Sequence, residues 1–282
     1  MTATGLMPLE PSLVPRPEMS RLALRVSPVA VDVAITSRVN DNPMLWRRLP
    51  VEPDATTGGI DMHAFEEAVY DNRLLLADFA GTDILIDTCR FMVVPAERAD
   101  AEMCMEMFSA LYPDEDIDVV ITPVEPSVTS IAMAVAPALM SFVRRTFGEH
   151  ARVSHRLAPL CRYFALKSRE GNAGKLHVHL ENGRVDVMAY CAEGLLMANS
   201  FRVQTTEDAL FYVLAAARNL SFDNASDRVI VSGDIDMRDR LLPMLRKSIS
   251  CVMPMIFPSD VFSSGKESLD APFELVTIPL ID

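Results

Sequence analysis

The sequence predicts an α/β protein in which one strand-rich unit occurs twice, as two tandem lobes with the order βββαβα. Three observations predict this fold. First, 50% of the 282 residues are hydrophobic, which is enough to form one large core or two cores of ordinary domain size. Second, apolar residues alternate along short runs bounded by turn residues, as in strands with one buried face. Third, the alternating pattern of the first half returns at a constant offset in the second half.

The first lobe is predicted over residues 21–150, after a flexible Pro-rich tail at residues 1–20. It begins with a hairpin whose first strand places Leu22, Leu24 and Val26 on one face. Further strands are expected near residues 44–51, 83–86, 91–94 and 117–122, and helices near residues 61–70, 97–111 and 127–147. The last of these helices is so rich in apolar residues that we expect it to be buried on most sides.

A connecting segment with a short strand and a helix is predicted over residues 151–174, and the second lobe over residues 175–282. In the second lobe, Leu176, Val178 and Leu180 alternate as in the opening hairpin, and Asn182-Gly183 supplies a tight type I′ turn. A third strand (195–203), a helix (206–219), a strand (228–231) and a helix (236–249) follow. Both halves therefore give three antiparallel strands, then helix, strand, helix.

Two copies of this order, packed about a cleft, resemble the actin-like ATPase architecture, a duplicated ribonuclease-H-like fold shared by actin, sugar kinases and Hsp70 chaperones. Two segments also resemble an uncharacterised bacterial family known as domain of unknown function 3822: Arg90-Phe91-Met92-Val93-Val94-Pro95 and Val229-Ile230-Val231-Ser232-Gly233. The resemblance covers nearly the whole chain after the tail. It implies a fold but no activity.

In active members of the actin-like class, the resemblance implies a phosphate loop at each turn between the first two strands. The first turn here is Val26-Ser27-Pro28-Val29, in which Pro28 removes one N–H donor and no Gly or acidic residue is present. The second turn, at Asn182-Gly183, is too short to surround a phosphate. We therefore expect no catalytic residues and no ATP hydrolysis.

Ser232, Gly233 and Asp234 lie where the resemblance places the adenosine site. A Gly there permits a flat ring to approach, and the start of a helix accepts an anion. The simpler interpretation is that Gly233 turns the chain and Asp234 caps the following helix. Binding of ATP or ADP without turnover stays open, and no other cofactor is expected.

His177 and His179 lie two residues apart on one predicted strand and so project from the same face. Counting back from the turn pairs His179 with Asp186, and two imidazoles with a carboxylate could hold a metal ion or move protons. A polar sheet face with a favourable cross-strand pair is the preferred interpretation, because no third ligand or nucleophile is evident. Asp32 and Asp186 occupy matching places, but in different lobes, which disfavours a two-metal nuclease.

Composition excludes several classes of partner. A net charge of -13 repels nucleic acid and anionic lipid. No signal peptide is evident, and the apolar stretch at residues 131–143 is short of the ~20 residues that span a bilayer. Five cysteines in no paired spacing are typical of reduced thiols in a cytoplasmic protein.

The leading hypothesis is a non-catalytic or weakly nucleotide-binding protein that acts by contacting another protein. The alternative is an ATP-dependent kinase or ATPase with unconventional residues in the cleft. A metal or proton site at His177, His179 and Asp186 is a third, weaker hypothesis. Core filling is the expected role of most of the 17 methionines, although Met103 and Met107 share a helix face that could bind a protein.

Overall fold

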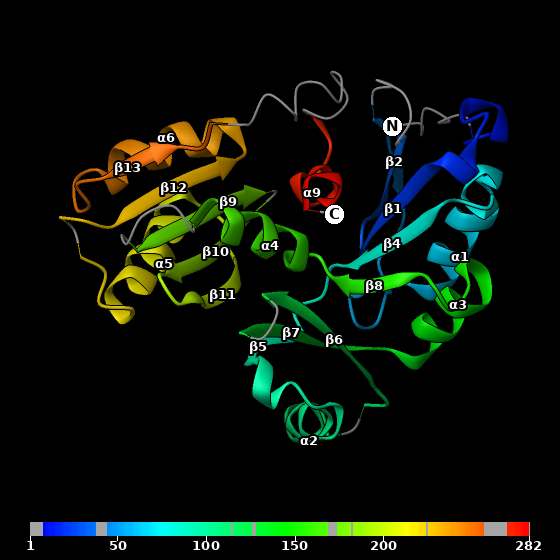
Figure 1. The fold of residues 1–282 in the computed structure, drawn as a ribbon, viewed down its shortest axis with the longest axis horizontal. Coiled ribbons are helices and arrows are strands. Elements are labelled where there is room, and N and C mark those ends of the chain that lie inside the picture. Colours follow the sequence, from blue (N-terminus) through cyan, green and yellow to red (C-terminus); the bar gives the residue numbers. More distant parts are fainter. Residues whose placement is uncertain are drawn as a thin grey trace.

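A computed structural model describes residues 8–37, 44–113, 115–125, 128–168, 174–181, 183–223, 225–256 and 270–281. In this part of the chain, two five-stranded sheets form two lobes and a three-stranded sheet lies beside them (Figure 1). The predicted α/β class and the two-lobe arrangement are confirmed. Residues 38–43, before the strand expected near residues 44–51, and Asn182 of the second hairpin turn lie outside the described residues.

The first lobe is built on a sheet with the strand order β3-β2-β1-β4-β8. β1, β2 and β3 pair antiparallel, whereas β4 runs parallel to β1 and β8 parallel to β4. Helices α1 and α3 cover its outer face. The bounds are β1 Ser20–Ser27, β2 Ala30–Ser37, β3 Leu45–Pro50, α1 Met62–Tyr70, β4 Gly81–Ile86, α3 Pro137–Phe147 and β8 Arg152–His155.

The second lobe repeats this arrangement with the strand order β11-β10-β9-β12-β13. Again three antiparallel strands are followed by two parallel ones, and helices α5 and α6 lie on the outer face (Figure 1). The bounds are β9 Lys175–Glu181, β10 Arg184–Cys191, β11 Gly194–Arg202, α5 Thr206–Asn219, β12 Arg228–Gly233, α6 Ile235–Leu245 and β13 Val252–Pro254. The two predicted hairpins thus occupy corresponding places in their sheets.

The alternation of side chains explains why each sheet has two different faces. Leu22, Leu24 and Val26 pack with the outer helices of the first lobe, because alternate residues of a strand point to the same side. Ala23 and Arg25, between them, point to the inner side. The second lobe is built in the same way, with Leu176 and its alternate neighbours in the outer core.

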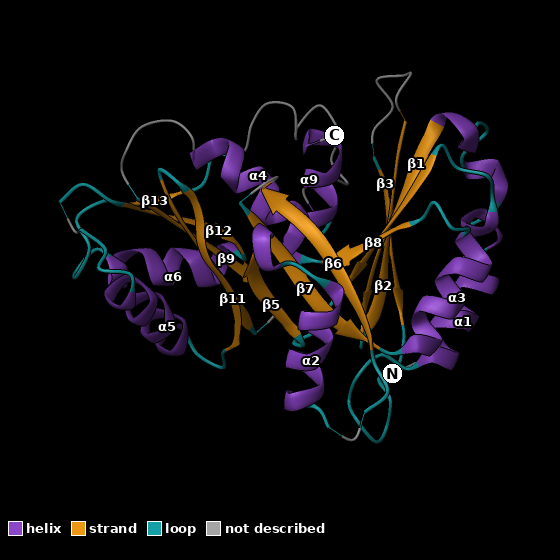
Figure 2. Cartoon of the chain, turned by 60° about the horizontal axis from the view of Figure 1, so that its bottom comes forward, coloured by secondary structure: helices purple, strands orange, loops and turns teal. Residues whose placement is uncertain are grey.

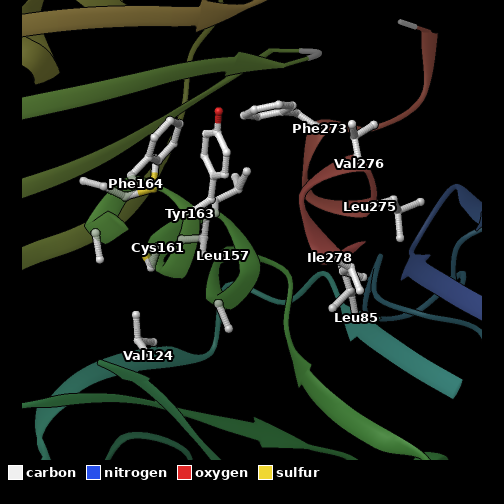
Figure 3. Packing of buried hydrophobic residues seen from close by; sticks show 14 of the residues in the cluster. Leu85, Val124, Leu157, Cys161, Tyr163, Phe164, Phe273, Leu275, Val276 and Ile278 are labelled. Carbon is white, nitrogen blue, oxygen red and sulfur yellow. The ribbon is translucent and has the colours of Figure 1, made fainter. Parts of the chain in front are cut away.

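An inner core lies between the two sheets and contains helices α4 (Leu157–Ser168) and α9 (Phe273–Ile281). Ala23 and Leu85 of the first sheet and Met188 of the second belong to the same buried cluster. Figure 3 shows Phe273 of α9 beside Tyr163 and Phe164 of α4, and the rings of Tyr163 and Phe273 meet edge to face at 5.5 Å. The last described helix of the chain therefore lies at its centre.

The three-stranded sheet has the order β5-β7-β6 and carries helix α2 on its outer side (Figure 2). Its elements are β5 Phe91–Pro95, α2 Ala101–Leu111, β6 Asp118–Glu125 and β7 Thr129–Val135. The helix expected over residues 127–147 is wrong in its first half, which forms β7. Every residue of β7 is buried because it is the central strand, so its apolar run lacks alternation. Pro137 then occupies the first turn of α3, where its missing N–H costs nothing.

Two segments predicted to lie outside the first lobe pack against it or belong to its sheet. Residues 8–19 form two 3-10 turns against the first lobe, with Leu9 buried and its N–H bonded to Asn72 at 2.8 Å. β8, from the expected connecting segment, completes the first sheet.

None of the described helices has the length and apolarity needed to cross a bilayer. All five cysteines are free thiols, two of them buried.

Candidate functional site between the two lobes

The polar groups of the turn between β1 and β2 form hydrogen bonds within the turn itself. The Ser27 hydroxyl donates to the Ala30 carbonyl at 2.8 Å and accepts from the Ala30 N–H at 3.1 Å. Pro28, in the middle of the turn, has no N–H. The turn therefore offers no run of consecutive free N–H groups to a phosphate.

The second turn is bounded by an ion pair. Arg184 donates to Glu181 at 2.8 Å, and Gly183 between them has a positive φ of 72°, which favours glycine. The Gly183 carbonyl accepts from the N–H of Val203 at 2.8 Å. The strand register matches the prediction, with Leu180 opposite Val185 and His179 opposite Asp186.

Glu181 also faces the first lobe, where it forms a two-pronged ion pair with Arg25 of β1. The two hydrogen bonds measure 2.5 and 3.0 Å, and the Arg25 side chain is 5% exposed. Burial alone would raise the pKa of Glu181, but Arg25 and Arg184 together lower it to about 2. Glu181 is therefore ionised throughout the physiological pH range.

A second two-pronged pair joins the lobes at Arg156, which directly follows β8. Arg156 donates to Asp186 of β10 at 2.7 and 2.6 Å, and neither side chain is more than 1% exposed. Burial opposes ionisation of Asp186, yet Arg156, Arg184 and His179 together lower its pKa to about 2. Such planar pairing is the strongest form of charged hydrogen bond.

Asp87, directly after β4, connects these pairs. It accepts from Arg156 at 3.0 Å, from Arg184 at 2.8 and 3.0 Å, and from Arg25 at 3.3 Å. Burial raises the pKa of Asp87, but the three guanidinium groups hold it well below its usual range. We call the connected set the inter-lobe ion cluster: Arg25, Asp87, Arg156, Glu181, Arg184, Asp186 and Glu274.

Among the described residues, Glu274 of α9 is the carboxylate of this cluster that lacks a complete set of hydrogen-bond partners. It is fully buried, and one of its oxygens lies 3.0 Å from Nη1 of Arg25 and 4.0 Å from Nη1 of Arg156. Neither oxygen accepts a well-aligned side-chain hydrogen bond within the described residues. Burial raises the pKa of Glu274 to about 7, with Arg25 opposing the shift and Glu181 adding to it.

His179 lies opposite Asp186 in the sheet, whereas His177 lies opposite Met188, and each histidine is engaged by another neighbour. Nε2 of His177 lies 3.0 Å from the Ser168 hydroxyl, and its ring stacks on Phe164 at 4.2 Å. Nδ1 of His179 lies 3.0 Å from the Ser232 hydroxyl. Burial and Lys175 lower the pKa of His177 to about 3, and burial also lowers the pKa of His179. The described residues contain no His, Cys, Asp and Glu grouping suited to a metal ion.

Ser232, Gly233 and Asp234 each have a contact within the protein. Gly233 has a φ of 92°, and a Cβ placed there would lie 1.9 Å from the Leu180 carbonyl oxygen. Asp234 caps α6 by accepting from the Met237 N–H at 2.7 Å. The Ser232 hydroxyl also lies 3.3 Å from the Val178 carbonyl. This segment packs on the end of β9.

Asp32 lies apart from Asp186, in the first sheet, as the nuclease argument anticipated. It is fully buried, 3.5 Å from Nη1 of Arg48. Burial raises its pKa, with Arg48 and Arg25 opposing the shift. Asp32 and Asp186 therefore belong to different ion pairs, with Arg48 and Arg156 respectively.

Sequence reasoning did not single out the arginines of the cluster or Glu274. The sequence did contain a signal for a buried charge, because Arg25 stands between Leu24 and Val26 in a run of buried strand residues. Arg156 likewise precedes the buried helix α4. A charged residue inside an apolar run predicts a buried ion pair, but not its partner in a distant strand.

Comparison with known proteins identifies the family and the fold of the chain. The family model described as protein of unknown function (DUF3822) matches residues 15–252. A Bacteroides thetaiotaomicron protein with an actin-like ATPase fold and unknown function is similar in structure, with a TM-score of 0.75 and 22% identity over 93% of this chain and 97% of that one. A PilM-PilN type IV pilus biogenesis complex gives a TM-score of 0.54 and 13% identity, covering 94% of this chain and 100% of that one. The fold is thus the actin-like ATPase fold. The curated proteins gave no match.

Proposed function

The chain belongs to DUF3822, a family of proteins of unknown function, and from that premise we propose that it is a non-catalytic actin-like protein that acts by contacting another protein. The inter-lobe ion cluster carries this proposal. In an actin-like ATPase, donors at the two turns would face a nucleotide. Here the guanidinium groups beside both turns are directed at carboxylates of the chain itself.

The apolar packing of helix α9 supports the same proposal. Phe273, Leu275, Val276 and Ile278 are buried in the inner core, between the two sheets (Figure 3). A ligand between the lobes would have to displace α9 and break charge pairs that are costly to leave half-paired. The second structural neighbour is described as a complex of two proteins, which accords with a role in protein contacts. Five free cysteines favour a place in the cytoplasm.

The alternative function is an ATP-dependent kinase or ATPase with unconventional residues. One observation favours it: Arg25, Arg156 and Arg184 converge on Asp87 between the lobes, and guanidinium groups bind phosphate well. This function requires α9 and Glu274 to leave the inner core when nucleotide enters.

Nucleotide measurements test the proposal. Purified protein is expected to release phosphate from ATP and Mg²⁺ no faster than an Asp87→Asn variant or a protein-free blank. A ligand at 100 times its dissociation constant adds ~2.7 kcal/mol of stability, so a thermal shift with ATP or ADP is a sensitive test, and none is expected. Calorimetry should give no heat, or equally weak affinities for ATP and ADP. Turnover that survives purification and is lost in Asp87→Asn would overturn the proposal in favour of the ATPase.

A further inference from the structure

Helix α2 carries a row of exposed apolar side chains that its own core does not use. Met103, Met107 and Leu111 are 40%, 45% and 64% exposed, and they are spaced four residues apart on one face. Cys104 and Phe108, on the adjacent face of the helix, are buried against the three-stranded sheet. Single exposed apolar residues are ordinary, but a contiguous row of three is typical of an interaction site.

An acidic row runs beside this apolar row. Glu102 and Glu106 are exposed, one helical turn apart, and neither forms an ion pair within the described part of the chain. Exposed Glu97, Asp100 and Asp116 lie at nearby sequence positions, where Arg98 is the exposed basic residue between Glu97 and Asp100. The face therefore joins an apolar strip to uncompensated negative charge.

The position of α2 leaves this face open. The helix lies on the side of the three-stranded sheet away from the two large sheets, in both views (Figures 1 and 2). Methionine side chains are flexible and polarizable, so they adapt to partners of different shape. The face is remote from the inter-lobe ion cluster and serves no part of it.

We infer that this α2 face, formed by Glu102, Met103, Glu106, Met107 and Leu111, binds a basic amphipathic helix of a partner protein. This inference rests on the proposed function in protein contacts and names the partner's chemistry. Apolar residues of such a helix, spaced three and four apart, would cover the methionine row, while its Lys or Arg side chains would reach the glutamate row. A second copy of this chain is disfavoured, because two acidic faces repel, and an anionic membrane is disfavoured for the same reason.

Binding of a synthetic amphipathic helix tests the inference. The probe is a labelled helical peptide of about 15 residues made of Leu and Lys, measured by fluorescence anisotropy against the full chain. Met103→Gln/Met107→Gln and Glu102→Gln/Glu106→Gln are each expected to weaken binding about tenfold, since two buried methionines or two ion pairs are lost. Met103→Leu/Met107→Leu should keep the affinity, because the row stays apolar. A peptide of Leu and Glu should not bind.

Matched controls locate the effect on α2. Met253→Gln, at another exposed methionine, and Glu10→Gln/Glu18→Gln, at exposed acids near the start of the chain, should leave the affinity unchanged. Equal loss in these controls, or no loss in the α2 variants, would overturn the inference. Two other results would overturn the inference by identifying another occupant of the α2 face. These are self-association of the chain, or its binding to phosphatidylserine vesicles, if Met107→Gln abolishes either one. The nucleotide measurements above are independent, so either proposal can fail alone.

Discussion

Arg156, directly after β8 of the first sheet, and Asp186 of the second sheet are joined by two hydrogen bonds of 2.7 and 2.6 Å, with both side chains buried. The pair links the end of β8 to β10, close to the start of that strand. The lobes are thus held together at their centre by charge as well as by the apolar inner core.

Arg156→Met should destabilise the protein by about 3–5 kcal/mol, because Asp186 is left buried without its main counter-charge. Urea unfolding measures the change. Arg145→Met is the matched control, since its pair with Glu66 at 3.4 Å is exposed and such pairs contribute about 0–1 kcal/mol. Adding Asp186→Leu to Arg156→Met should recover part of the loss. Equal costs for the two single variants would show that the buried pair does not join the lobes.

Gly233→Ala should be far more destabilising than Gly148→Ala, and the comparison separates steric from conformational strain. Both glycines have positive φ, 92° and 83°, where other residues are strained by about 1–3 kcal/mol. A Cβ at Gly148 meets nothing within 4 Å, whereas one at Gly233 would overlap the Leu180 carbonyl oxygen. Thermal unfolding should show a small loss for Gly148→Ala and several times that loss for Gly233→Ala. Similar losses would mean that β12 and β9 do not approach this closely.

Glu274→Gln should remove a pH dependence from the free energy of unfolding. The folded pKa of Glu274 is raised by burial to about 7, from an ordinary value of 4.5. Between these values the unfolded chain releases a proton that the folded protein keeps, so this group lowers stability as pH rises, and the penalty is complete above pH 7. The stability of Glu274→Gln relative to wild type should therefore increase by on the order of 2–3 kcal/mol from pH 4.5 to 8. A stability difference that stays constant over this range would show that burial does not raise the pKa of Glu274.

His177→Gln should change the pH dependence in the opposite direction. The folded pKa of His177 is lowered to about 3 by burial and by Lys175, whereas the unfolded value is 6.5. As pH falls below 6.5, the unfolded chain binds a proton that the folded protein excludes, so this group's contribution to stability is lost on acidification. Between pH 6.5 and 5 the wild type should lose on the order of 2 kcal/mol more than His177→Gln. Identical slopes would show that His177 is accessible to solvent.

The hairpins were predictable because their information is local. Leu22, Leu24 and Val26 alternate within one strand, and the same alternation at Leu176 identified the second lobe. The cross-strand pair of His179 and Asp186 followed from counting residues back from the turn. Short-range periodicity and turn chemistry therefore sufficed for the fold class.

The inner parts of the molecule were not predictable in the same way. β7 is buried on both faces, so its apolar run has neither the period of a strand nor that of a helix, and only its position between β5 and β6 defines it. Arg25 and Glu181 are separated by 156 positions along the chain, and nothing local identifies them as partners. Long-range pairing of buried charges depends on the packing of the lobes, which a single sequence does not reveal.

The position of α9 affects the order in which the molecule can be completed during synthesis. β1 to β13 are synthesised before residues 273–281, so α9 is the last of the described elements to become available for packing. The side of the inner core that α9 covers, including Ala23 and Ala34, stays uncovered until that helix is available. Arg25 likewise gains its contact with Glu274 only at that stage. A chain truncated before residue 273 should consequently expose apolar surface that a chaperone can bind.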